Sequence, residues 1–209
     1  MLLSILDCRP LPIRRNFRMS DQALIHHSGC PENIPSGAQA DRLVDLVVQR
    51  LALAQDVAAA KYDSGVPIDD PVRELEILES AAHALKARGP RQRIVIQFFR
   101  DQIEANKVIQ RELHQRWRRH PEESPAANPD VVAELRLKLD KITGQLTRLF
   151  NSMSKFPQYT HGHLAELIDE RFSAMAPGQQ LPKMHRDAAL FAMRAFCTDA
   201  SARIGLSGP

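Results

Sequence analysis

The sequence lacks the features that mark several large classes of protein. Nowhere in its 209 residues is there a run of eighteen apolar side chains, about the minimum for a helix that spans a bilayer. No segment alternates apolar and polar residues as a half-buried strand does. There is no glycine-rich phosphate loop and no nucleophile–base pair, and the three cysteines match no zinc-binding spacing. We therefore expect no membrane, no metal and no cofactor.

The net charge is also small. The chain has 28 basic and 25 acidic residues, a formal charge of +3, and its sequence pI is about 8.9. This balance does not indicate a nucleic-acid-binding protein. Four arginines do cluster, at Arg111, Arg116, Arg118 and Arg119, and we interpret them as the solvated C-terminal end of a helix, where the helix dipole favours cations. A phosphate-binding surface with salt-sensitive DNA binding is the alternative.

Residues 1–37 lack any periodic pattern. They mix Pro, Gly, Ser, His and Arg, and we expect them to be extended or disordered. A short apolar stretch ends at Asp7 and is followed by arginines, which makes a poor secretory signal. Asp7 also precedes Cys8, which spoils a lipoprotein cleavage site. The sequence allows either a Cys8–Cys30 disulfide or three free thiols, so the cysteines do not indicate whether the compartment is oxidising or reducing.

The remainder of the chain is periodic in the way helices are. Apolar residues recur at three- and four-residue spacing, and Gly and Pro separate the segments. We predict an all-α fold class, a single domain over 38–205 whose first part ends near 120 and whose C-terminal extension begins near 130. About six helices are expected, over 39–62, 70–85, 91–119, 131–153, 160–175 and 182–203.

Two cations stand out in the first predicted helix. Arg50 and Lys61 are eleven residues apart, and eleven steps of 100° return to within about 20° of the same direction. Both are therefore expected on one helical face, roughly 16 Å apart along the axis, where they could grip the two ends of a small dianion. Taken by itself, the pattern is more typical of two unrelated surface cations.

A second group follows at the start of the next predicted helix. It consists of Asp70, Arg73 and Glu74, with Pro71 between them. Asp is a favoured N-cap and Pro is favoured at the first helical position. Helix capping alone is thus a full explanation for Asp70.

A third group lies on the predicted helix 91–119. Gln102, Asn106 and Gln110 are spaced by four residues and form a polar stripe. Uncharged amides suit a partly buried site, because they donate hydrogen bonds without the desolvation cost of a charge. A solvated face is an equally good interpretation of this stripe.

Taken together, the three groups resemble one known family, the all-helical, type II chorismate mutases. The resemblance lies in the order and spacing of Arg50, Lys61, Asp70, Arg73, Glu74, Asn106 and Gln110. Its clearest stretches are RLALAQDVAAAKYDSGVPIDDPVRELE and FFRDQIEANKVIQ. It covers roughly residues 38–200 and is strong over 50–118. The long C-terminal extension is similar to that of the long, usually exported subclass.

The resemblance implies the intramolecular Claisen rearrangement of chorismate to prephenate, which needs no cofactor or metal. Arg50 would bind one substrate carboxylate with its planar fork. Arg136, on the helix after the loop, would bind the other, and Arg73 would reach the same region. Lys61 and Gln110 would donate hydrogen bonds to the breaking ether oxygen, as charge stabilisation in such a site requires.

The resemblance also implies weaker assignments. Glu74 and the backbone of Asp70 would hold the ring hydroxyl, and Asn106 stands where the family has a small hydroxyl residue. The subclass often bridges its C-terminal helices by a disulfide, but residues 150–165 contain no cysteine to pair with Cys197, so we expect no bridge.

The resemblance also has implications for the partners of the protein and for its cellular compartment. The resemblance implies chorismate as the substrate and a homodimer, with no nucleic acid and no membrane. The subclass indicates a periplasmic or secreted protein, while the poor signal leaves a cytoplasmic one open. The alternatives in function are an isochorismate–pyruvate lyase-like enzyme and a non-catalytic helical binding module on the same scaffold.

Overall fold

Two helix ends lie at residue types that favour caps, one at Asp70 and one at Gly65. In the computed structural model, α3 (Pro71–Ala84) starts after Asp70, whose Oδ1 accepts a hydrogen bond from the Arg73 backbone N–H at 3.1 Å. The Asp70 N–H in turn donates to Glu74 Oε1 at 3.3 Å. α2 (Ala54–Ser64) ends at Gly65, whose φ of +67° lies in the left-handed region that favours glycine. These caps satisfy backbone groups that helix ends leave without partners.

The structure describes residues 36–125, 131–175 and 182–198. They belong to the compact unit that spans Ile34–Pro209. Residues 1–35 of the predicted N-terminal segment, with Cys8 and Cys30, lie outside them. The last two residues of that segment, Ser36 and Gly37, are helical, so the predicted boundary at 37 is wrong. The described residues confirm the all-α fold class: their only strand-like pairing is an isolated bridge between Tyr159 and Cys197. The other elements are α1 (Ser36–Ala52), α4 (Pro90–Arg119), η1 (Pro121–Glu123), α5 (Val131–Ser152), α6 (His161–Met175), α7 (Lys183–Ala192) and η2 (Arg194–Phe196).

Two of the predicted helices are wrong in extent. The single helix expected over 39–62 is two helices, because the regular pattern breaks at Leu53. Past the break, α2 packs against α4, and its Ala54 and Ala58 are fully buried. The last predicted helix, over 182–203, ends at Ala192; the chain then turns and places Phe196 in the core.

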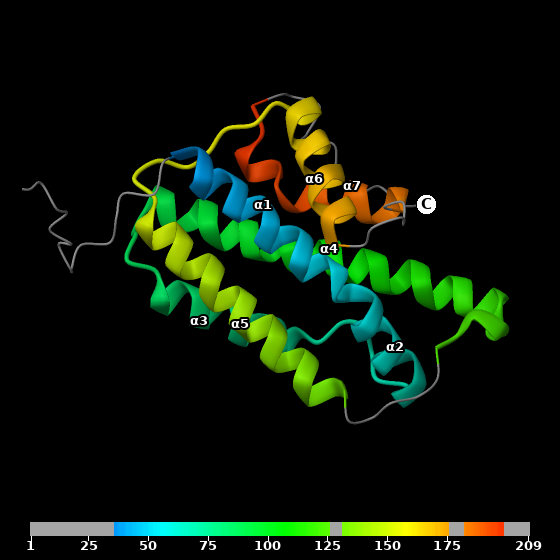
Figure 1. The fold of residues 1–209 in the computed structure, drawn as a ribbon. Helices are drawn as coiled ribbons and strands as arrows, with labels where there is room; N and C mark the ends of the chain where they lie inside the picture. The colour runs from blue at the N-terminus through cyan, green and yellow to red at the C-terminus, as the bar shows by residue number, and fades with distance from the viewer. Residues whose placement is uncertain (1–35, 126–130, 176–181, 199–209) are drawn as a thin grey trace, which may run out of the picture. The chain divides into compact units, whose positions relative to one another are not determined.

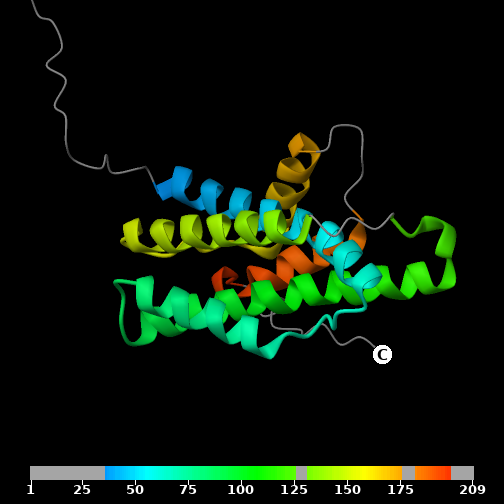
Figure 2. The ribbon, with the colours of Figure 1, turned by 90° about the horizontal axis from the view of Figure 1, so that it is seen from below.

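The helices pack in an order that leaves α4 in the middle. α4 contacts α2 and α3 and also contacts α7, while α5 lies along α1. In Figure 1, α6 and α7 are at the top of the view and α3 and α5 at the bottom, with α1 and α4 between them. Figure 2, turned by 90°, again shows α5 beside α1 and α3 beside α4. The same arrangement brings α2, α3, α4 and α5 around one space.

An aromatic cluster forms the centre of the core. The rings of Phe98, Phe150 and Phe196 have centroids 5.1 to 5.8 Å apart, and Phe99 and Phe156 extend the cluster. Offset and edge-to-face pairs at this range are favourable beyond their buried area. The cluster joins α4, α5 and η2, so the C-terminal part of the chain is packed into the same core as the first helices.

Candidate active site

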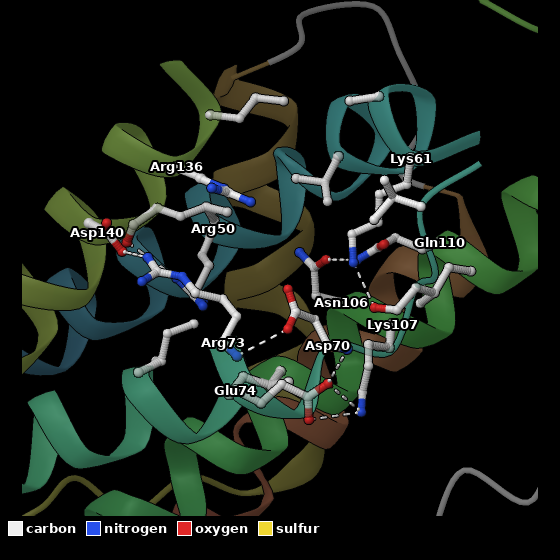
Figure 3. A pocket seen from close by; sticks show the side chains of 18 of the residues that line it. Arg50, Lys61, Asp70, Arg73, Glu74, Asn106, Lys107, Gln110, Arg136 and Asp140 are labelled. Carbon is white, nitrogen blue, oxygen red and sulfur yellow. Dashed lines mark hydrogen bonds and ion pairs between the residues drawn. The ribbon is translucent and has the colours of Figure 1, made fainter. Parts of the chain in front are cut away.

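One cavity of about 300 Å³ lies between α2, α3, α4 and α5, beside the end of α1. Every side chain predicted for the site lines it: Arg50, Lys61, Asp70, Arg73, Glu74, Asn106, Gln110 and Arg136. Figure 3 shows Arg50, Arg73 and Arg136 on one side of this space and Lys61 and Gln110 on the other. Residues from five helices, up to 86 positions apart in the sequence, thus meet at one place.

Arg50 is the most deeply buried cation of the cavity. Only 4% of its surface is exposed. Its Nη1 donates to Thr143 Oγ1 at 3.0 Å and to the Leu139 carbonyl at 3.3 Å, so α5 holds the guanidinium in place. Burial lowers the pKa of Arg50 to about 10, although Asp140 opposes the shift. The side chain therefore remains charged at neutral pH.

Lys61 is held by the loop that follows its own helix. Its Nζ donates to the Ile68 carbonyl at 2.6 Å. Burial lowers the pKa of Lys61, and the nearby carboxylates of Asp70 and Glu74 act against this shift. An ammonium has three N–H donors, so the bond to Ile68 leaves others for a ligand.

The predicted geometry of the Arg50–Lys61 pair needs a correction. The two residues were expected on one face of one helix, but Arg50 lies on α1 and Lys61 on α2. The break at Leu53 separates the two helices. Both side chains nevertheless line the same cavity. That the two residues act on one ligand remains a prediction, although they reach the cavity from two helices and not from one.

Arg73 reaches the cavity from α3 and is paired across it. Its Nη2 lies 2.6 Å from Asp140 Oδ1 on α5, and its Nη1 lies 3.1 Å from Glu76 Oε2. Burial lowers the pKa of Arg73, but the hydrogen bonds to Glu76 and Asp140 outweigh it, and the net shift is upward. Arg136 enters from α5 on the same side as Arg73 and Arg50. Three guanidinium groups thus surround one end of the cavity.

Two amides from α4 supply the neutral part of the site. Gln110 Nε2 donates to Asn106 Oδ1 at 2.5 Å, and both side chains are buried. The Gln110 Oε1 is buried without a hydrogen-bond partner. Buried polar atoms usually have partners, so this amide is available to a ligand, as a donor or an acceptor according to its rotation.

The third member of the predicted amide stripe lies elsewhere. Gln102 is fully buried, but its Nε2 points to the Ala192 carbonyl at 3.5 Å, at the contact with α7. Residues four apart drift by about 40° around a helix, so eight residues separate Gln102 from Gln110 by about 80°. Because of this drift, Gln102 and Gln110 point toward different elements that pack against α4.

Two charged side chains of the cavity were missed by the sequence analysis. Lys107 lines it and pairs with Glu74, and Asp140 lines it and pairs with Arg73. A signal was present, because Lys107 lies four residues after Ile103 and Asp140 four after Arg136, and such pairs share a helical face. Apart from this spacing, nothing in the sequence distinguishes these two charged residues from ordinary surface residues.

A group that could hold a metal occurs away from the cavity. Among the described residues, His120, Glu122 and Glu123 place a ligand atom each within 4.8 Å of one another. All are exposed, and Glu123 is bonded to Arg116. None of them lines the cavity, so this group has no part in the chemistry of the site.

The chemistry available to the cavity follows from its lining. Three guanidinium groups lie at one end and an ammonium and an amide at the other, and apolar side chains such as Val57, Ile77 and Leu135 also line the cavity. Donors fixed before the ligand arrives can stabilise negative charge that develops during a reaction. The fold and the cavity together define the class of protein: an all-α protein with a cationic, half-apolar cavity suited to a small dianion.

Comparisons with known proteins give the family. The family model of chorismate mutase type II matches residues 40–111. The crystal structure of chorismate mutase from Burkholderia phymatum has a TM-score of 0.63 and 30% sequence identity, over 78% of this chain and 100% of that one. Two relatives are each named secreted chorismate mutase. The one from Mycolicibacterium smegmatis is 28% identical over 74% of this chain and 84% of its own length. The one from Mycobacterium tuberculosis is 24% identical over 77% and 79%.

The chain belongs to the all-helical chorismate mutase family, and it is an isomerase of that family. The described part of the chain also contains no helix both long and apolar enough to cross a membrane.

Proposed function

We propose that the cavity catalyses the rearrangement of chorismate to prephenate and that the eight predicted residues carry it. The observation that supports this most is their convergence: eight side chains chosen from sequence order line one space of about 300 Å³. The reaction breaks a C–O bond and forms a C–C bond within one molecule. A protein can therefore promote it by holding a compact conformer and stabilising charge.

The arginines would bind the substrate's two carboxylates. Arg50 is fixed by Thr143 and Leu139, so it needs no reordering when a carboxylate arrives. Arg136 would take the second carboxylate and Arg73 would assist at the same end, where the three guanidinium groups lie together. A fixed planar fork loses little freedom when it binds a carboxylate in bidentate geometry.

Lys61 and Gln110 would act on the ether oxygen. Both lie on the side of the cavity opposite the arginines, and both have N–H donors that their present partners do not use. Negative charge develops on that oxygen as the C–O bond breaks. Hydrogen bonds that strengthen only at this stage stabilise the transition state more than the bound substrate, and they therefore lower the barrier. Glu74 and Asp70 would hold the ring hydroxyl, and Asn106 supports Gln110 through their hydrogen bond.

Product analysis tests the reaction itself. Purified protein is incubated separately with chorismate and with isochorismate, and products are separated by chromatography. We expect prephenate from chorismate and no release of pyruvate from isochorismate. Release of pyruvate would favour a lyase of the same scaffold. Binding of chorismate without turnover would favour a non-catalytic module, and either result contradicts the proposal.

We further propose that the chain forms a homodimer, as the family resemblance implies. The eight predicted site residues meet in a cavity within a single chain, so the proposed dimer and the proposed reaction can be tested separately. Light scattering coupled to size-exclusion chromatography should give twice the chain mass. A monomer with full activity would contradict the dimer and leave the proposed reaction intact.

Export is the proposed fate of the protein. Its support is the pair of relatives named secreted chorismate mutase. Cell fractionation of the producing organism, with mutase activity measured in each fraction, tests it. Activity confined to the cytoplasm would contradict export.

A further inference from the structure

One buried cation of the cavity has no role in the proposed reaction. Lys107 lies on α4 between Asn106 and Gln110, and only 9% of its side chain is exposed. Burying an ammonium is costly unless it is paired. A lysine would therefore not be held at this place without partners that compensate its charge.

The partners of Lys107 are three carboxylates from three segments. Its Nζ lies 2.7 Å from Glu104 Oε1, 3.1 Å from Glu74 Oε1 and 3.2 Å from Asp69 Oδ1. An ammonium has three N–H donors and no acceptor. The three carboxylates use all of them, so Lys107 has no donor left for a substrate although it lines the cavity.

Glu74 is the one of these three carboxylates that lines the cavity. Its Oε1 accepts from the Asp70 N–H at 3.3 Å, and its Oε2 accepts from Lys107 Nζ at 3.2 Å. Figure 3 shows Lys107 reaching Glu74 from the side away from the arginines. Without Lys107, Glu74 would keep a single backbone donor at the helix end and would lie near the carboxylates of Asp69, Asp70 and Glu104.

We propose that Lys107 is a positioning residue that acts through Glu74: it orients the Glu74 carboxylate and balances its charge, so that Glu74 can accept a hydrogen bond from the substrate's hydroxyl. The inference rests on the proposed function of the cavity. It extends that function by one residue and assigns Lys107 to substrate affinity rather than to the reacting bonds.

A second contact to the loop before α3 makes the position of Lys61 independent of Lys107. The loop before α3 carries Ile68, whose carbonyl holds Lys61, and Asp69, which Lys107 contacts. Arg111 also binds Asp69, at 2.7 Å, so the loop stays attached to α4 when Lys107 is removed. Loss of Lys107 should therefore affect Glu74 and leave Lys61 in place.

A double-mutant cycle tests the inference. Lys107→Met, Glu74→Gln and the double variant are compared with the parent in steady-state kinetics with chorismate. The substrate's hydroxyl takes no part in the bonds that break and form. Weakening the contact between Glu74 and this hydroxyl therefore weakens the binding of substrate and transition state alike, and it raises KM more than it lowers kcat. We expect Lys107→Met to raise KM about tenfold with kcat within about twofold, and to have less than about a twofold effect in the Glu74→Gln background.

Three controls accompany the cycle. Lys107→Arg keeps the charge and should restore most of the affinity. Lys138→Met removes an exposed lysine that pairs with Glu134 on α5, outside the cavity lining, and should leave both constants unchanged. Circular dichroism checks the folding of each variant. If Lys107→Met does not fold, Lys107→Gln, which keeps donors without the charge, takes its place.

The outcomes are distinct. An equal loss from Lys107→Met in the parent and in the Glu74→Gln background would show that Lys107 does not act through Glu74. A fall in kcat with unchanged KM would place its effect at the reacting bonds and overturn the inference as well. An inactive parent would instead contradict the proposed function.

Discussion

At the scale of single residues, Gln110 determines how the site should respond to pH. A glutamine amide donates a hydrogen bond at every pH, whereas a carboxylic acid donates only while it is protonated. The Gln110 Oε1 is buried and unpartnered, and its Nε2 bonds to Asn106. Nε2 carries two N–H groups, and Asn106 takes one of them. The other can donate to the ether oxygen at any pH, so this position should cause no loss of activity near neutral pH.

Gln110→Glu makes that difference measurable. The variant can donate only below the pKa of the new carboxyl group, so its kcat/KM should fall as pH rises through that pKa. The parent should show no such fall over the same range. The measurement is a pH–rate profile of both proteins from roughly pH 5 to pH 8. Parallel profiles would remove Gln110 from its proposed role.

At the scale of the elements, the start of α3 serves both the fold and the site. Asp70 caps the helix through its Oδ1 and also lines the cavity. The cap fixes where α3 begins, and with it the positions of Arg73 and Glu74 one turn later. Stability and geometry are therefore linked at this residue.

Substitution of the cap should cost stability in a predictable way. Asp70→Ala removes the side-chain acceptor and should lower the free energy of unfolding by about 1 kcal/mol. Asp70→Asn keeps an acceptor oxygen and should cost much less. Urea unfolding followed by circular dichroism measures both. Equal stability of Asp70→Ala and the parent would mean that the bond to Arg73 is not maintained in solution.

The elements also show what the sequence could and could not predict. Caps at Asp70 and Gly65 are local, so the limits of α3 and the end of α2 were predictable. The break at Leu53 was not, because its backbone stays near the helical region (φ −74°, ψ −8°) and no Gly or Pro marks it. Past the break, α2 packs against α4, and such a tertiary contact leaves no local signal in the sequence. Lys107 and Asp140 were missed because their roles depend on partners that are distant in sequence.

At the scale of the whole described unit, the C-terminal helices brace the wall of the site. Asp101 on α4 is 2% exposed, and Arg194 binds it through two hydrogen bonds of 2.7 and 2.8 Å. Tyr159 donates from its hydroxyl to the Ala40 carbonyl at 2.8 Å, which ties the segment before α6 to α1. These contacts hold α1 and α4 from the side where the cavity residues do not lie.

Removal of Arg194 tests this bracing role. Arg194→Met leaves the buried Asp101 carboxylate without its cation, and should lower the free energy of unfolding by about 3 kcal/mol. Well below the unfolding transition, kcat and KM should stay near the parent values. Arg186→Met breaks an exposed pair with Asp169 and should cost less than about 1 kcal/mol. Thermal and urea unfolding compare the two, and similar costs would show that the Asp101 pair does not brace α4.

The most direct test of the central claim is the turnover of Lys61→Ala. Loss of one charge-stabilising donor should lower kcat/KM for chorismate by about two to three orders of magnitude, while the helical circular dichroism signal stays intact. Lys138→Met, an exposed lysine outside the cavity, should react at the parent rate. If purified, folded Lys61→Ala converts chorismate to prephenate as fast as the parent, the cavity does not work as proposed.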